Sequence, residues 1–149
     1  MKKEEIIYEL MESVYDLSRQ ISSYESIPRK YGTEDELYMV EAHTINLIGN
    51  KTQTTASELA NLTKKTKGAI SQMVNKLIKK GLVLKSKNPI DKREFILELT
   101  EKGKMVYDFH YQLDKAEYTK ILNKLHQFSE EDLLVYIKIS SILSENTSK

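Results

Sequence analysis

The fold of this 149-residue chain is decided by Thr55–Gly103, which reads TASELANLTKKTKGAISQMVNKLIKKGLVLKSKNPIDKREFILELTEKG. Thr55 and Thr66 are typical N-cap residues, and they predict the starts of a short helix and of a second, lysine-rich helix. Gly81 is expected to end the second helix in a left-handed conformation, and two strands follow around the turn Asn88–Asp91. Helix, turn, helix and hairpin in this order predict a winged helix-turn-helix, which is a DNA-reading motif.

Positive charge is concentrated in the same stretch. Residues 64–93 hold ten Lys or Arg side chains and one acid, Asp91, so this segment carries a net charge of +9. The whole chain has 23 basic and 22 acidic residues, which leaves 13 basic and 21 acidic residues, or −8, for the remainder. A basic segment in an otherwise acidic chain favours the phosphate backbone as its partner. We therefore predict that the chain binds double-stranded DNA.

Apolar spacing predicts the buried side chains of this stretch. The lysine-rich helix has apolar residues at steps of three, one and three, which form one stripe. Strands are expected over residues 82–84 and 94–99. In the second strand Phe95, Leu97 and Leu99 alternate with Glu94, Ile96 and Glu98, so one face is mostly buried. The predicted core positions are Leu59, Ala60, Leu62, Ile70, Met73, Val74, Leu77, Phe95, Leu97 and Leu99.

Further helices are expected on both sides. Residues 3–24 have apolar side chains three and four apart, as in a coiled-coil seam, and such a helix packs on its own domain or, as we favour, on a partner subunit. The capping box Thr33–Glu36 predicts the start of the next helix, and Gly49 its end. Thr100 is expected to cap a long helix that reaches about residue 125.

The last predicted helix opens at Ser129 and is apolar around nearly its whole circumference over residues 133–139. Such a helix is normally buried, and one small domain has too little surface to cover it. A homodimer would cover it.

Composition excludes several classes of function. The chain has no cysteine, which removes disulfides, thiolate-bound zinc and thiol catalysis. It has no Gly-rich phosphate loop, GxSxG elbow or HExxH helix, so we predict neither enzyme activity nor a cofactor. No apolar run reaches the ~18 residues of a membrane span, and the start, MKKEEIIYEL, does not read as a secretory signal. We expect a cytoplasmic protein without membrane contact.

Three motifs in order carry a resemblance to a known family: SELANLT, ISQMVNKLIKKGLV and DKREFILELTEKGK. The last two resemble the LxxxGLV segment and the DxRxxxxxLTxxG wing of the MarR family of bacterial winged-helix regulators. The resemblance covers roughly residues 36–111, and Lys92 departs from it where the family often has arginine. It implies an obligate homodimer in which the first and last helices of both chains form the dimer domain.

The expected fold is mainly α with a small antiparallel β-hairpin wing. We predict an N-terminal dimerisation helix over residues 1–32, the winged helix-turn-helix over 33–100, and C-terminal dimerisation helices over 101–149. A shorter motif, Glu41–Ile45 followed by Ile48 and Gly49, resembles the FabT-like repressors of bacterial fatty-acid synthesis.

The exposed face of the lysine-rich helix is expected to enter a major groove, where Gln72 and Asn75 have the reach to read adenine. The resemblance implies that Asp91 orients Arg93 into the minor groove. The alternatives are a solvated lysine-rich helix surface and a surface salt bridge. The predicted DNA-binding residues are Thr66, Lys67, Gly68, Ser71, Gln72, Asn75, Lys76, Lys85, Lys87, Asp91, Lys92 and Arg93.

A small apolar, aromatic or acyl effector is expected because regulators of this family often bind a ligand between their dimer and DNA-binding domains. The candidate lining residues are Tyr15, Tyr38, Met39, His43, Met105, Phe109 and Tyr111, for which core packing is the alternative. The expectation of an acyl ligand depends on the resemblance to the FabT-like motif. We predict no metal site from His43, His110 and His126, since Glu41 and His43 point in different directions on a helix.

The sequence thus favours a homodimeric regulator, expected to be a repressor, on an inverted-repeat operator with half-sites about one helical turn apart. The alternative is a winged-helix protein-interaction module that has lost DNA binding. Such a loss would be expected to leave acids or hydrophobic residues on the second helix and wing, where lysines dominate instead. A small enzyme ranks third.

Overall fold

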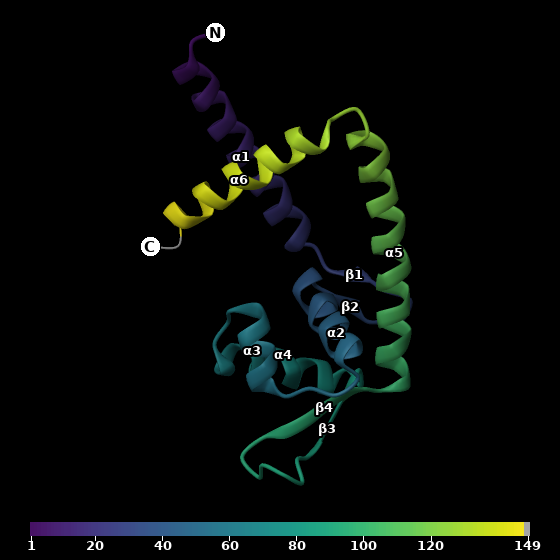
Figure 1. Cartoon of the computed structure of the whole chain (residues 1–149). Coiled ribbons are helices and arrows are strands. Elements are labelled where there is room, and N and C mark those ends of the chain that lie inside the picture. The colour runs from purple at the N-terminus through teal and green to yellow at the C-terminus, as the bar shows by residue number, and fades with distance from the viewer. Residues whose placement is uncertain (148–149) are drawn as a thin grey trace. The chain divides into compact units, whose positions relative to one another are not determined.

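A computed structural model describes residues 1–147 of the chain, and this part contains six helices and two small antiparallel hairpins (Figure 1). The elements are α1 (Lys3–Glu25), β1 (Arg29–Lys30), β2 (Glu36–Leu37), α2 (Met39–Lys51), α3 (Ala56–Thr63), α4 (Lys67–Lys79), β3 (Val83–Lys87), β4 (Phe95–Leu99), α5 (Glu101–Leu125) and α6 (Glu130–Thr147). The predicted class, mainly α with an antiparallel wing, is confirmed. Residues up to Tyr111 form one compact unit, and the chain from Gln112 on belongs to a second.

Local caps start the helices of the central stretch as predicted. The hydroxyl of Thr55 accepts a hydrogen bond from the third amide of α3 at 3.2 Å, and that of Thr66 accepts one from the third amide of α4 at 3.1 Å. Gly81 follows α4 with a φ of +72°, a conformation in which a residue without Cβ has no steric penalty. β3 then pairs with β4 from Val83 opposite Leu99 to the hairpin's outer end (Figure 1).

The core of the first unit lies where α2, α3, α4 and the base of the hairpin meet. Most predicted core positions are buried or half-buried, but two predictions are wrong: Leu62 is 51% exposed and Phe95 is 41% exposed. α3 is only eight residues long, so it buries one position, Leu59, and its last turn faces outward. Phe95 lies at the outer end of β4, beyond the helices, where the Nζ of Lys85 sits 4.1 Å from the centre of its ring.

The predicted start of α2 at Thr33 is wrong, because the helix begins at Met39. The Thr33 hydroxyl accepts a hydrogen bond from the amide of Asp35 at 3.3 Å and so makes a local turn, while β2 pairs with β1. A different cap starts the helix. The carboxylate of Glu41 accepts the amide of Tyr38 at 3.1 Å, one turn later than the sequence suggests.

Gly49 lies inside α2 and does not end it, which corrects another prediction, since the helix continues to Lys51. A Cβ at Gly49 would overlap the ring of Tyr107 on α5. The hydroxyl of Tyr107 also donates a hydrogen bond to Oδ1 of Asn50 at 2.7 Å. This glycine therefore serves close packing between two helices.

Thr54, in the connection between α2 and α3, forms an isolated antiparallel β-bridge with Leu97 of the hairpin. The amide of Thr54 donates to the carbonyl of Leu97 at 3.1 Å, and the amide of Leu97 donates back at 2.8 Å. Thr54 is buried, so the base of the wing is fixed to the body of the unit.

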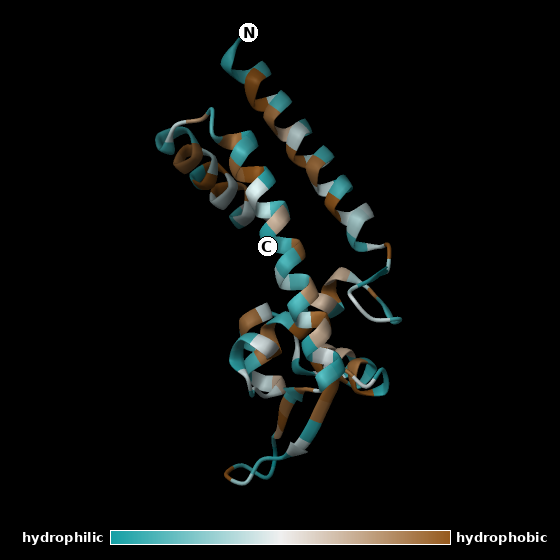
Figure 2. Cartoon of the chain, turned by 90° about the vertical axis from the view of Figure 1, so that its right-hand side faces the viewer, coloured by the Kyte–Doolittle hydropathy of each residue, from teal (hydrophilic) through white to brown (hydrophobic). Residues whose placement is uncertain are grey.

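Apolar side chains of α1 are left uncovered by the rest of the first unit. Figure 2 shows hydrophobic residues recurring along this helix, which bears the N-terminus. None of its residues is buried, and Ile7, Ile21 and Tyr24 are 51%, 48% and 43% exposed.

The second unit contains the end of α5 and α6. Ser129 caps α6, since its hydroxyl accepts the amide of Asp132 at 3.1 Å and its amide donates back to that carboxylate. Leu134, Tyr136 and Ile137 are 63%, 56% and 58% exposed in the single chain. Among residues 1–147, no helix combines the length and apolarity that crossing a membrane requires.

Candidate nucleic-acid interface

α4 separates its apolar and polar side chains onto opposite faces. Ile70, Val74 and Leu77 are buried against the body of the first unit. The other face exposes Gln72, Asn75, Lys76 and Lys79, and Ser71 lies half-buried at its edge. Amide and hydroxyl groups presented in this way have the donors and acceptors that match base edges in a major groove.

The start of α4 is open to an approaching partner. No atom lies within 4 Å of a Cβ built at Gly68, so packing within the described chain does not demand a glycine there. Glycine in a helix costs about 1 kcal/mol relative to alanine. The predicted role of Gly68, close approach of the backbone to a phosphate, therefore has the space it needs.

The wing presents an arginine held by an aspartate. Nε of Arg93 lies 3.2 Å from Oδ1 of Asp91, and the Arg93 amide donates to the same oxygen at 3.0 Å. The hydrogen bond from the Arg93 side chain, and then the one from its amide, lower the pKa of Asp91 below its ordinary value. The Arg93 side chain is 90% exposed. An ion pair this exposed adds little stability, so its effect is to orient the guanidinium.

The wing also carries three lysines. Lys85, Lys87 and Lys92 are all exposed, and Lys85 also stacks on the ring of Phe95. Flexible ammonium groups of this kind neutralise phosphates without reading bases.

A hollow of about 240 Å³ joins the polar face of α4 to the wing. Five of the predicted DNA-binding residues line it together, namely Lys67, Ser71, Asn75, Lys85 and Arg93. The other predicted residues lie on α4 or the wing outside this hollow, and the contacts of all twelve with DNA stay predictions.

Glu94 is a residue of this surface that the sequence reasoning missed. Its carboxylate accepts a hydrogen bond from Nζ of Lys67 at 2.5 Å and another from the hydroxyl of Ser57. These two hydrogen bonds, that of Lys67 first, lower the pKa of Glu94 below its ordinary value. In the sequence, Glu94 is notable only as an acid directly after the basic segment. Its partners could not be predicted from local patterns, because they lie 27 and 37 residues away in the sequence.

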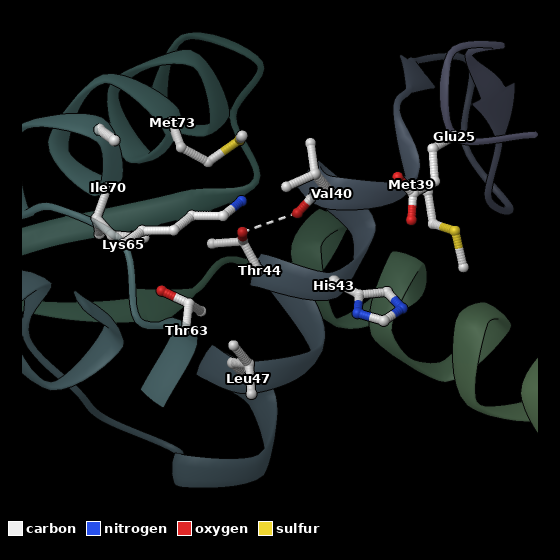
Figure 3. Close-up of a pocket in the computed structure, with 11 residues that line it drawn as sticks. Glu25, Met39, Val40, His43, Thr44, Leu47, Thr63, Lys65, Ile70 and Met73 are labelled. Atoms are coloured by element: carbon white, nitrogen blue, oxygen red, sulfur yellow. Dashed lines mark hydrogen bonds between the residues drawn. The ribbon is translucent and has the colours of Figure 1, made fainter. Parts of the chain in front are cut away.

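A second cavity, of about 380 Å³, lies beside α2 and α4 (Figure 3). Of the predicted ligand-binding residues, Met39 and His43 line it. The remaining lining residues were not predicted: Glu25, Val40, Thr44, Leu47, Thr63, Lys65, Ala69, Ile70 and Met73. Its walls are mainly apolar, and Lys65 provides one cationic group (Figure 3).

The other predicted ligand-binding residues do not line this cavity. Phe109 packs edge-on against Tyr31, with ring centres 6.4 Å apart, and closely approaches Gly32. Tyr15 and Tyr38 are 53% and 46% exposed, and Met105 and Tyr111 are also exposed. Phe109 thus contacts the β1–β2 hairpin but is still 45% exposed, so its predicted role in ligand binding stays a prediction.

The rings of His43 and His110 lie 5.5 Å apart, and His110 is buried. Among residues 1–147, no three His, Cys, Asp or Glu side chains converge into a group that could hold a metal ion. The absence of a metal site stays a prediction.

Known proteins resemble this chain in sequence and in fold. The profile of the MarR family matches residues 37–95. An uncharacterised HTH-type transcriptional regulator of Bacillus subtilis, YhjH, is 26% identical over 106 residues, which are 70% of this chain and 60% of YhjH. The chain thus spans about 60% of the length of the curated relatives that it matches.

Solved structures match nearly the whole chain. The FabT protein of Streptococcus pneumoniae in complex with DNA is 25% identical, with a TM-score of 0.69 and 98% of each chain covered. The adhesin competence repressor AdcR of Streptococcus pyogenes has a TM-score of 0.78 at 19% identity, with 94% of this chain and 98% of AdcR covered. The second likeness shows the shared fold alone.

Proposed function

We propose that this chain is a bacterial transcriptional repressor of the MarR family, whose profile matches residues 37–95, and that it binds an operator in double-stranded DNA as a homodimer. One observation carries the proposal. The polar face of α4 and the exposed guanidinium of Arg93 border the same hollow, in a segment of net charge +9. The likeness to FabT, whose structure contains DNA, supports it. Such a protein would act in the cytoplasm, where bacterial DNA lies.

In this proposal, α4 enters the major groove and the wing reaches the neighbouring minor groove. Gln72 and Asn75 are the candidates for reading bases, because both are exposed amides on the outer face of α4. Arg93 would insert where the minor groove is narrow and its potential most negative. The surrounding lysines would set position and affinity through phosphates.

The exposed apolar side chains of α1 and α6 support a second copy of the chain as the partner. Side chains such as Ile21 and Ile137 are about half exposed in the single chain, at 48% and 58%, and they are large enough to drive association. A two-fold dimer presents two copies of α4, so the operator would be an inverted repeat with half-sites about 34–36 Å apart.

The cavity beside α2 and α4 is the proposed effector site. Ile70 and Met73 belong to α4 and Val40 and Leu47 to α2, so a ligand there would touch the DNA-reading helix directly (Figure 3). Lys65 and Glu25 lie on opposite sides of the cavity (Figure 3), so an apolar chain whose anionic end lies at Lys65 and away from Glu25 fits these walls, which favours an acyl ligand. The ligand would change DNA affinity only through different affinity for the two states of the protein.

The test is a fluorescence-anisotropy titration of the full chain with its own promoter DNA and with an unrelated duplex. We expect tight binding that prefers the promoter and weakens steeply with salt. Arg93→Ala should weaken promoter binding by roughly tenfold, in line with the loss of one specific contact, without changing the melting temperature. Binding to neither duplex at low salt would overturn the proposal and favour the interaction module.

A further inference from the structure

The carboxylate of Glu94 connects three elements of the DNA-reading unit. Glu94 lies directly before β4, and its amide donates to the carbonyl of Asp91 at 3.1 Å, which closes the tip of the wing. Its side chain accepts hydrogen bonds from Ser57 in the first turn of α3 and from Lys67, the first residue of α4. One side chain thus joins the wing to the starts of both helices of the helix-turn-helix.

The side chain of Glu94 is less exposed to solvent than that of the neighbouring acid Asp91. The Glu94 side chain is 16% exposed, whereas that of its partner Lys67 is 54% exposed. Asp91 and its partner Arg93 are 39% and 90% exposed. The ammonium of Lys67 is therefore turned inward to a shielded carboxylate, while the guanidinium of Arg93 is turned outward.

A carboxylate at this position has an electrostatic consequence for a DNA-binding surface. It lies in the wall of the hollow between α4 and the wing and repels phosphates, at the edge of a segment otherwise rich in lysine. It also holds the ammonium of Lys67 in an ion pair. Without this ion pair, Lys67 would neutralise a DNA phosphate whatever the base sequence. Non-specific affinity comes almost entirely from such phosphate contacts. If the promoter complex is fixed by base contacts and does not use Lys67, withholding this lysine lowers non-specific binding alone and so raises the ratio of specific to non-specific binding.

We propose that Glu94 is a positioning and specificity-determining residue, which fixes the wing against α3 and α4 and withholds Lys67 from non-specific phosphate contacts. The inference rests on the proposed DNA-binding function and refines the sequence prediction for Lys67. Ser57 carries the positioning part, because it ties the wing to α3 without charge. The ion pair with Lys67 is responsible for the electrostatic role, because it keeps this ammonium from contacting phosphates.

The test uses the full-length protein with promoter and unrelated duplexes over a series of salt concentrations. Glu94→Gln keeps an acceptor for Ser57 but removes the charge that holds Lys67. Ser57→Ala removes the neutral tie and leaves the ion pair. Glu117→Gln is the matched control, because Glu117 forms an exposed ion pair with Lys120 at 2.9 Å on α5.

E94Q should steepen the slope of log affinity against log salt by about 0.9 per subunit, because Lys67 becomes free to neutralise one phosphate. Affinity for the unrelated duplex should rise roughly three- to tenfold at low salt, so the preference for the promoter falls. Ser57→Ala should lower promoter affinity by a few-fold with the slope unchanged. E117Q should match the wild type.

A second variant separates this role from a merely structural one. Lys67→Gln should leave the slope unchanged when Glu94 is present, since Lys67 then contacts no phosphate, but should abolish the steepening in the E94Q background. Equal slopes and equal promoter preference for E94Q and the wild type would overturn the inference. A shallower slope for Lys67→Gln alone would also overturn it, since Lys67 would then already be bound to phosphate.

The wild-type titration comes first and distinguishes the two failures. If the wild type binds neither duplex at low salt, the proposed function fails before any variant is compared. If it binds with promoter preference and the variants behave like the control, only the role of Glu94 fails. Hydrogen exchange of the β3–β4 amides, without DNA, should quicken in Ser57→Ala, and unchanged exchange would contradict the positioning role.

Discussion

Replacing Lys80 with methionine would leave the carboxylate of Glu41 without its cation. Glu41 is 3% exposed, and its Oε2 lies 3.1 Å from Nζ of Lys80, which also donates to the carbonyl of Glu36 at 3.1 Å. This ion pair ties the start of α2 to the residue that follows α4. Lys80→Met keeps most of the apolar stem of the side chain, so the change tests the charge rather than the packing.

The expected loss can be worked out from the burial of the two groups. Removing one partner of a fully buried ion pair costs about 3–5 kcal/mol. The Lys80 side chain is 32% exposed, so water will reach Glu41 in the variant and reduce the cost to about 2–3 kcal/mol. For a chain of this size, that corresponds to a fall in melting temperature of roughly 4–12 °C.

The assay is urea and thermal unfolding at a fixed protomer concentration, because the stability of the proposed dimer would depend on that concentration. Lys120→Met is the control, because Lys120 pairs with Glu117 where both side chains are exposed, and its effect should stay within about 0.5 kcal/mol. In a double-mutant cycle with Glu41→Gln, the losses should be less than additive by about 1 kcal/mol. A Lys80→Met protein as stable as the control would refute the reasoning.

Two further predictions concern stability. Gly49→Ala should destabilise the chain by about 1–3 kcal/mol, because its Cβ overlaps the ring of Tyr107, whereas Gly68→Ala, which meets open space, should not lower the melting temperature. The lowered pKa of Glu94 means that its contribution to stability is present above its ordinary pKa of 4.5 and is lost as the pH falls through the folded-state value. The stability difference between the wild type and Glu94→Gln, measured in urea at neutral pH and again in acid, should therefore shrink in acid. A difference that stays constant would show that the charge of Glu94 contributes nothing.

Much of the helix-turn-helix and its wing follows from local sequence. Thr55 and Thr66 start their helices as predicted, because a cap acts on amides only three residues away. Gly81 adopts its left-handed conformation for an equally local reason. The pairing of Asp91 with Arg93 is also local, since the two residues are two positions apart.

Local patterns mislead where two of them compete or where a partner is distant. Residues 33–36 match the sequence pattern of a capping box, yet no helix begins there. Instead β2 pairs with β1, and the carboxylate of Glu41 caps the helix that begins at Met39. Gly49 resembles a helix end, and only the ring of Tyr107, 58 positions further along, explains why a glycine lies inside the helix.

The sequence by itself determined the order of elements, the basic segment and the family resemblance, because caps, periodicity and net charge depend on neighbours along the chain. Tertiary structure alone decided which charges pair with a shielded carboxylate and which are turned outward. Lys67 and Arg93 look alike as basic residues of one segment, but folding brings Glu94, which also accepts a hydrogen bond from Ser57, to the first and leaves the second 90% exposed. Contacts between residues so far apart depend on how helices and hairpin pack, which no local pattern encodes.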